Sequence, residues 1–175
     1  LSGAINDVLY KTVTVYYQFF PGFIEILKPR QIIELGGAMG VGSLCMLHSE
    51  YKDFKLYSIT LAEENLEFCY VNKKNYPNFY PIVGDYMDLS IWPKDVDLGK
   101  TDIWFVDGEH SYDHIKKELD LYKSFFKKGA ILLFDDIYIS KEFNKFWQEI
   151  ESLVPVDFRQ DYPLHWTGFG VLHIC

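Results

Sequence analysis

Three aspartates and one histidine are the side chains of this sequence best suited to chemistry at a shared site. Asp107 follows one apolar run, Asp135 and Asp136 follow the next, and His110 lies three residues beyond Asp107. Clustered carboxylates repel one another and need a cation or a proton between them. Because oxygen ligands are what Mg²⁺ prefers, we predict a divalent-metal site at Asp107, Asp135 and Asp136. The alternative is that these acids only cap the turns that follow the strands.

His110 is the candidate general base. A neutral imidazole beside a bound cation can take the proton of a substrate hydroxyl whose oxygen is to act as a nucleophile. His110 and Asp107 are therefore the predicted catalytic residues. A histidine at a helix start that only hydrogen-bonds to the backbone is the alternative.

A glycine-rich loop at residues 36–42 follows a short apolar run that contains Glu34. Glycines between a buried strand and a helix allow a tight turn and a close approach of the backbone to a ligand. The dinucleotide pattern G-x-G-x-x-G would need glycine at position 38, where this chain has Ala38. An acid at the strand end suits a cationic ligand better than a pyrophosphate. We predict ligand contacts from Glu34, Gly36, Gly37 and Gly40, with a purely structural turn as the alternative.

Apolar runs and amphipathic stretches alternate along the chain and define the elements that must position these residues. The expected strands are 31–35, 55–61, 79–83, 102–106, 130–134, 155–159 and 168–174, and the expected helices are 43–51, 63–75, 112–127 and 141–153. This alternation predicts an α/β fold, a Rossmann-like three-layer αβα sandwich with a mostly parallel seven-stranded sheet and an antiparallel C-terminal hairpin. Ligands of such sheets bind beyond the carboxyl ends of the strands, where the motifs fall.

One domain over residues 1–175 is expected, with an N-terminal helical segment at 1–28 and a Rossmann-like core at 29–175. Pro21 and Gly22 interrupt the helical spacing of the N-terminal segment. Its aromatic residues could cover a substrate, but packing in the core is the favoured interpretation. These residues are Tyr10, Tyr16, Tyr17, Phe19, Phe20 and Phe23.

Charge and composition exclude several classes of function. The formal net charge of −8 disfavours a nucleic-acid partner, because the chain as a whole would repel a polyphosphate backbone. No apolar run approaches the roughly 20 residues of a membrane helix, and no signal peptide is evident. Three widely spaced cysteines without a C-x-x-C pair favour reduced thiols and a cytoplasmic location. A first residue of Leu suggests a trimmed chain.

The run Asp107-Gly-Glu-His-Ser-Tyr112, followed by Asp135-Asp136 after the next strand, resembles the class I S-adenosylmethionine-dependent methyltransferases. Within them it is similar to the branch that holds metal-dependent macrolide-sugar O-methyltransferases and cephalosporin hydroxylase-like proteins; catechol and caffeoyl-CoA O-methyltransferases share the layout of acids. The resemblance implies Mg²⁺ on the three aspartates and His110 as the base. It also implies that Asp85, beside Tyr86, contacts the adenine amino group.

One position departs from that family. Its members usually end the second strand with an acid that holds the ribose hydroxyls, and here Thr60 takes that place. A threonine offers one neutral hydrogen bond where a carboxylate offers two charge-assisted ones. Weak cofactor binding, or a different cofactor, would follow.

Together these features predict methyl transfer from S-adenosylmethionine to a hydroxyl of a small polar acceptor, such as a sugar or another natural product. The main alternative is a catalytically weak or inactive nucleotide-binding domain, or an interaction module, which Thr60 would favour. A metal-dependent oxygenase is least favoured, because no set of two histidines and one carboxylate is evident.

Overall fold

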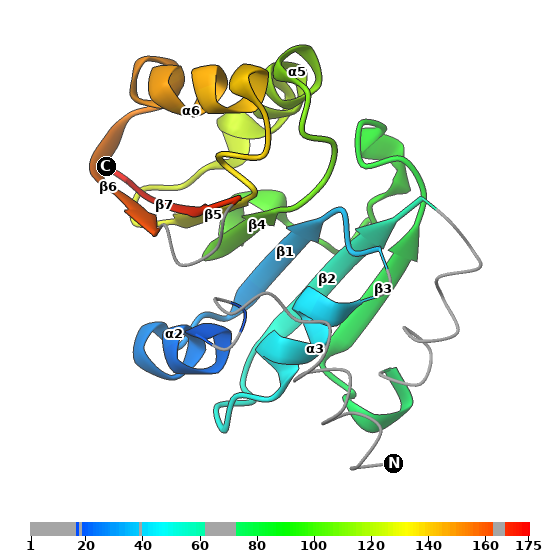
Figure 1. The fold of residues 1–175 in the computed structure, drawn as a ribbon. Coiled ribbons are helices and arrows are strands. Elements are labelled where there is room, and N and C mark those ends of the chain that lie inside the picture. Colours follow the sequence, from blue (N-terminus) through cyan, green and yellow to red (C-terminus); the bar gives the residue numbers. More distant parts are fainter. Residues whose placement is uncertain (1–16, 18, 39, 62–72, 163–166) are drawn as a thin grey trace.

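The computed structural model describes residues 17, 19–38, 40–61, 73–162 and 167–175. Its centre is a seven-stranded sheet with the strand order β3-β2-β1-β4-β5-β7-β6 (Figure 1). The strands are β1 (Gln31–Leu35), β2 (Lys55–Thr60), β3 (Phe79–Val83), β4 (Ile103–Val106), β5 (Ile131–Asp135), β6 (Val156–Tyr162) and β7 (Phe169–Ile174). Strands β1 to β5 are parallel to one another, and β7 pairs antiparallel with both β5 and β6. The predicted Rossmann-like sheet and its C-terminal hairpin are confirmed.

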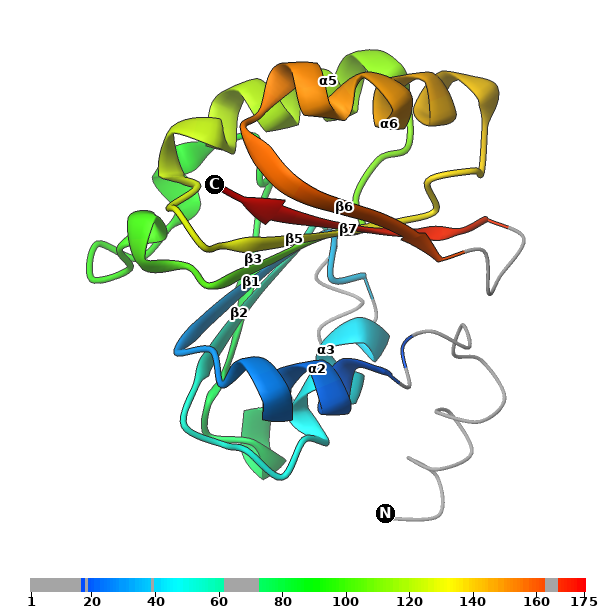
Figure 2. The ribbon, with the colours of Figure 1, turned by 90° about the vertical axis from the view of Figure 1, so that its left-hand side faces the viewer.

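Helices cover both faces of the sheet. The α-helices are α2 (Phe20–Leu27), α3 (Val41–Leu47), α5 (Tyr112–Tyr122) and α6 (Lys141–Leu153), and short 3₁₀ helices are η3 (Leu89–Ile91), η4 (Leu98–Lys100) and η5 (Lys123–Phe125). Helices α5 and α6 lie on one face, and α2 and α3 lie on the other (Figure 2). This gives the three predicted layers.

Strand β4 shows how the sequence fills both layers of the core. Its four residues are all buried, and successive side chains point to opposite faces. Trp104 and Val106 join the cluster under α5 and α6, whereas Ile103 and Phe105 join the cluster under α2 and α3. A strand covered on both faces reads as a continuous apolar run, which is why it was recognisable in the sequence.

Several element boundaries differ from those expected. Strand β3 and helix α6 have the predicted bounds, but the helix predicted at 112–127 ends at Tyr122 and continues as η5. Pro21 does not break a helix: it stands in the first turn of α2, where its missing N–H costs nothing and its fixed φ suits the helix. The helix expected at 63–75 falls mostly outside the described residues, and residues 1–16 of the predicted N-terminal helical segment 1–28 fall outside them entirely. No described helix is long and apolar enough to cross a membrane.

Strand order brings the predicted site residues to one edge of the sheet. Strand β4 lies between β1 and β5, with Val106 opposite both Leu35 and Phe134. The carboxyl ends of all three strands therefore meet, as expected from the sequence. Asp107 directly follows β4, and Asp135 is the last residue of β5.

Candidate active site

A cavity of about 310 Å³ opens at the carboxyl ends of the parallel strands. That volume lies at the lower end of the range of small-molecule sites. Four predicted site residues line it, namely Gly36, Thr60, Tyr86 and Asp107; sequence reasoning missed the other five, namely Ala38, Ile59, Leu61, Gly108 and Glu109. Of the missed residues, Gly108 and Glu109 directly follow Asp107 in the sequence. That adjacency to a predicted site residue could have identified them.

The glycine loop is pressed against the ends of two neighbouring strands. Gly36 has a φ of +95°, and a Cβ at this position would lie 2.1 Å from the carbonyl oxygen of Asp107. The N–H of Gly37 donates to the carbonyl of Ile59 at 2.7 Å, and a Cβ there would lie 2.0 Å from Ser58 Oγ. Only glycine fits at either position. Gly36 forms part of the cavity wall, while Gly37 holds the loop against β2.

Glu34 supports the loop from below and is not among the residues that line the cavity. It is fully buried on the α3 side of β1, where its carboxylate accepts a hydrogen bond from Ser43 Oγ. Burial raises the pKa of Glu34, and hydrogen bonds from Ser43 and Ser58 oppose that shift. Gly40, with a φ of +77°, is the N-cap of α3. Both residues shape the loop that we predicted would bind the ligand.

Thr60 and Tyr86 line the other side of the cavity, and Asp85 precedes Tyr86 in the chain. Thr60 ends β2 and is 4% exposed; the Tyr86 hydroxyl lies 2.9 Å from His114 Nε2 and accepts the N–H of Glu109 at 3.2 Å. Asp85 is exposed, and its Oδ1 accepts the N–H of Met87 at 2.8 Å in a local turn. Tyr86 and Thr60 thus face the cavity, and Asp85 is not one of its lining residues.

Asp107 and Asp135 are joined by Tyr17, a buried tyrosine that precedes α2 in the chain. The Tyr17 hydroxyl lies 2.7 Å from Asp107 Oδ2 and 2.7 Å from Asp135 Oδ2. Asp135 Oδ1 accepts the N–H of Asp136 at 2.7 Å. Burial raises the pKa of Asp107 well above its usual range; burial, with Asp136 nearby, raises the pKa of Asp135 to about 8.

His110 lies beside this carboxylate pair. Its Nε2 is 3.9 Å from Asp107 Oδ1 and 3.8 Å from Asp136 Oδ2, which is too long for a hydrogen bond. That nitrogen is buried and has no hydrogen-bond partner among the described residues. Burial lowers the pKa of His110, and Asp136 and Glu109 oppose the shift. An imidazole that stays neutral at pH 7, with one nitrogen unengaged, is able to accept a proton.

Residues 33–137 match the model of a methyltransferase domain family, which covers more than half of the chain. The chain belongs to this family. No curated protein matches its sequence significantly. The fold of this methyltransferase is also similar to those of several solved structures, at low sequence identity.

Two structural neighbours with bound ligands illustrate that similarity. The O-methyltransferase TomG from Streptomyces achromogenes, in complex with S-adenosylmethionine, has 13% identity and a TM-score of 0.76 over 98% of this chain and 88% of its own. The O-methyltransferase from Bacillus cereus, in complex with S-adenosylhomocysteine, has 12% identity and a TM-score of 0.71 over 98% and 87%. At such identities the likeness concerns the fold.

The structure does not support the predicted magnesium site of this methyltransferase. Among the described parts of the chain, no group of three or more His, Cys, Asp and Glu side chains is placed to hold a metal ion. Asp107 and Asp135 instead face the Tyr17 hydroxyl, which lies between them. The donor set as arranged does not fit a divalent cation, so we route no catalytic step through one.

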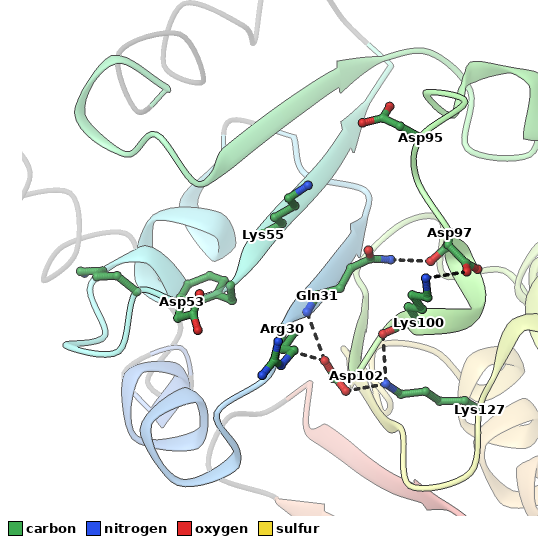
Figure 3. Close-up of a pocket in the computed structure, with 11 residues that line it drawn as sticks. Arg30, Gln31, Asp53, Lys55, Asp95, Asp97, Lys100, Asp102 and Lys127 are labelled. Atoms are coloured by element: carbon green, nitrogen blue, oxygen red, sulfur yellow. Dashed lines mark hydrogen bonds and ion pairs between the residues drawn. The ribbon is translucent and has the colours of Figure 1, made fainter.

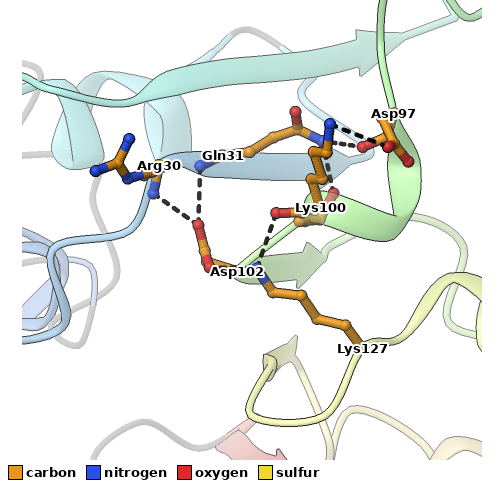
Figure 4. Close-up of polar contacts among 7 residues, drawn as sticks. Arg30, Gln31, Asp97, Lys100, Asp102 and Lys127 are labelled. Carbon is orange, nitrogen blue, oxygen red and sulfur yellow. Dashed lines mark hydrogen bonds and ion pairs between the residues drawn. The ribbon is translucent and has the colours of Figure 1, made fainter.

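A larger cavity, of about 540 Å³, lies at the opposite end of the sheet of this methyltransferase, near the amino ends of β1, β2 and β4 (Figure 3). Ion pairs line it, Lys127 with Asp102 and Lys100 with Asp97. Asp102 Oδ2 accepts the N–H groups of Arg30 and Gln31 at 2.7 and 3.1 Å, and its Oδ1 accepts Lys127 Nζ at 2.6 Å (Figure 4). The hydrogen bonds of Asp102 link the starts of β1 and β4, so we assign this group of residues a structural role.

Asp102→Asn should destabilise this methyltransferase by about 1–2 kcal/mol at pH 7, because the amide replaces a charged acceptor of three hydrogen bonds. Burial alone would raise the pKa of Asp102, but the bonds from Lys127, Arg30 and Gln31 outweigh it and lower the pKa. A lowered folded-state pKa stabilises the fold above the ordinary value of about 4, and that stabilisation is lost as the pH falls through the folded pKa. The difference in free energy of unfolding between Asp102→Asn and the wild type should therefore become smaller as the pH falls.

Urea unfolding at neutral and acidic pH measures this effect. Asp120→Asn is the matched control, because Asp120 also meets a lysine at 2.6 Å but both side chains are exposed. Its effect should be smaller, since exposed ion pairs contribute little to stability. An equal loss for both variants would contradict the role given to Asp102.

Proposed function

We propose that this methyltransferase uses S-adenosylmethionine to methylate a hydroxyl group of a small polar acceptor, such as a sugar or another natural product. The observation that carries the proposal is the charge of the cavity at the glycine loop. Asp107 and Glu109 line it, and no lysine or arginine is among its described lining residues. Such a wall disfavours a polyphosphate and favours a ligand with positive charge. The sulfonium of S-adenosylmethionine provides that charge.

The ligands of two structural neighbours support the choice of cofactor. TomG is in complex with S-adenosylmethionine and the Bacillus cereus enzyme with S-adenosylhomocysteine. A nucleotide-binding module, the main alternative, would need groups to neutralise phosphates. The cavity offers backbone from the glycine loop but no cationic side chain among its described residues. Cys45 is buried and unpaired, which is compatible with action in a reducing cytoplasm.

The chemistry supplied by the bound cofactor is an electrophilic methyl group, and the residues of the chain must place and deprotonate the nucleophile. A bound S-adenosylmethionine would supply its methyl carbon to the acceptor oxygen and would keep the electron pair of the broken carbon–sulfur bond on sulfur. The proton of the acceptor hydroxyl goes to Nε2 of His110. Asp107 lines the cofactor cavity, and His110 Nε2 lies 3.9 Å from its Oδ1, which places the base beside that cavity. Holding oxygen and methyl in line supplies much of the rate.

Isothermal titration with S-adenosylhomocysteine, ATP and NAD tests this proposal. We expect saturable binding of S-adenosylhomocysteine, with much weaker binding of the two phosphate-containing ligands. Tighter binding of ATP or NAD than of S-adenosylhomocysteine would contradict the proposal and favour the nucleotide-binding alternative.

Thr60→Asp should tighten binding of S-adenosylhomocysteine about fivefold, which corresponds to roughly 1 kcal/mol. The physical reason is that an Asp at the end of β2 can accept charge-assisted hydrogen bonds from both ribose hydroxyls, whereas Thr60 makes one neutral bond. Thr60 lines the cavity, so the new carboxylate would face the ligand.

Thr60→Asn is the control for Thr60→Asp: it has nearly the size of Asp but no charge, and should gain less affinity. Calorimetry measures all three proteins. Unchanged or weaker binding by Thr60→Asp would mean that the ribose lies elsewhere.

A further inference from the structure

The Tyr17 hydroxyl occupies the space between the two carboxylates at the ends of β4 and β5. It lies at the same distance, 2.7 Å, from Asp107 Oδ2 and Asp135 Oδ2. We infer that Tyr17 takes the place of a divalent cation there and closes the carboxylate pair to metal. The inference builds on the proposed function, because it concerns the carboxyl ends of β4 and β5, where His110 would deprotonate the acceptor. It implies methyl transfer without a divalent metal.

Proton counting supports this role for Tyr17. A phenol has one proton and can donate it to only one of the two carboxylate oxygens. Two oxygens at 2.7 Å without a proton between them would repel each other. The second contact therefore requires a proton on a carboxyl group, which then donates to the phenol oxygen. Protons hold the three groups together, and a divalent cation at this position would need both carboxylates free of protons and the hydroxyl displaced.

Packing fixes Tyr17 in this position. Its ring is stacked on Phe20 with centroids 5.1 Å apart and meets Phe105 edge to face at 5.7 Å. Tyr17 is 7% exposed, and both neighbouring rings are fully buried. Withdrawal of the hydroxyl would uncover aromatic surface and leave the two carboxyl groups facing each other. A cation would have to offset both costs before it could bind.

The contact between Tyr17 and Asp107 also bears on the position of His110. His110 Nε2 lies on the other side of Asp107, 3.9 Å from Oδ1, the oxygen that Tyr17 does not contact. Tyr17 is thus a positioning residue: it fixes the Asp107 carboxylate against which the imidazole lies.

Manganese binding to the full chain, followed by electron paramagnetic resonance, tests the inference without any methyl transfer. We expect no saturable Mn²⁺ binding by the wild type in the low millimolar range. Tyr17→Phe keeps the aromatic packing but removes the hydroxyl, so it should bind Mn²⁺ at least about tenfold more tightly. Adding Asp135→Asn to Tyr17→Phe should abolish that gain. Tyr138→Phe is the control, because it removes a similar Tyr–Asp hydrogen bond, at 2.8 Å to Asp161, that involves neither Asp107 nor Asp135.

Two results would overturn the inference. One is saturable Mn²⁺ binding by the wild type that Asp107→Asn removes, a result that does not depend on the folding of Tyr17→Phe. The other is the absence of binding by both the wild type and a Tyr17→Phe variant that melts cooperatively, since Tyr17 would then not be what closes the pair. Binding of S-adenosylhomocysteine, measured in parallel, separates these outcomes from failure of the proposed function.

Discussion

Replacing Gly36 with alanine should abolish detectable binding of S-adenosylhomocysteine. A Cβ at Gly36 would lie 2.1 Å from the carbonyl oxygen of Asp107 and 2.7 Å from the Cα of Gly108, both in the backbone. Neither atom can move without separating the loop after β1 from the loop after β4, and these loops form the cavity. This displacement, together with the strain of an alanine at a φ of +95°, should cost about 3 kcal/mol or more of binding free energy. Affinity for S-adenosylhomocysteine should therefore fall at least about a hundredfold.

Gly129→Ala provides a matched control for Gly36→Ala. Gly129 also has a positive φ, +84°, but a Cβ there would meet nothing within 4 Å. It should cost only about 1 kcal/mol of stability and leave affinity unchanged. Calorimetry measures binding, and circular dichroism shows whether Gly36→Ala is still folded. A folded Gly36→Ala variant with near wild-type affinity would remove this loop from the binding site.

His110→Ala should lower the rate of methyl transfer by about a hundredfold or more while leaving S-adenosylhomocysteine affinity within about twofold. Loss of the base affects only the step in which the acceptor proton is transferred, and His110 is not one of the residues that line the cofactor cavity. Because burial lowers the pKa of His110, the neutral imidazole persists as the pH falls below about 6.5. Wild-type activity should therefore decline only in more acidic solution.

Formation of S-adenosylhomocysteine over a panel of hydroxylated acceptors provides the measurement for His110→Ala. His48→Ala is the control, because His48 caps the end of α3 and contacts the Leu44 carbonyl at 3.0 Å. A His110→Ala variant as active as wild type would exclude His110 as the base. Equal losses in the two histidine variants would point to a general effect on the fold.

Local patterns in the sequence were sufficient for the sheet and for four of the nine described residues that line the cavity at the glycine loop. Strand β4 is a run of buried apolar residues and α6 has helical spacing, so both could be found from periodicity. Parallel order then places Asp107 and Asp135 at one edge, as β4 and β5 do in the structure. The chain segment that joins these two carboxylates could not be found in this way, because Tyr17 reaches them across 90 and 118 positions of sequence.

Four predicted binding residues, Glu34, Gly37, Gly40 and Asp85, do not line the cavity, and side-chain direction explains Glu34 and Asp85. Glu34 lies in β1 on the same face as Ile32, toward α3, and strand alternation could have indicated that it faces Ser43. Asp85 accepts the N–H of the residue two positions later, a local turn that Asp forms readily and that competes with binding a ligand. The resemblance to a family supplied the positions of these residues but not the directions of their side chains.

Strand β4 has an aspartate at each end, and the two ends act on different properties of the enzyme. Asp102 joins the starts of the strands, and Asp107 borders the cofactor cavity. Asp102 and Asp107 are five residue steps apart along an extended strand, which separates them by about 16 Å. At this separation, and with no shared partner among the described residues, the effects of Asp102→Asn and His110→Ala should add when the two are combined. Relatives could therefore differ in acceptor preference through substitutions at the Asp107 end of the sheet. The thermal stability that Asp102 contributes at the other end would be kept.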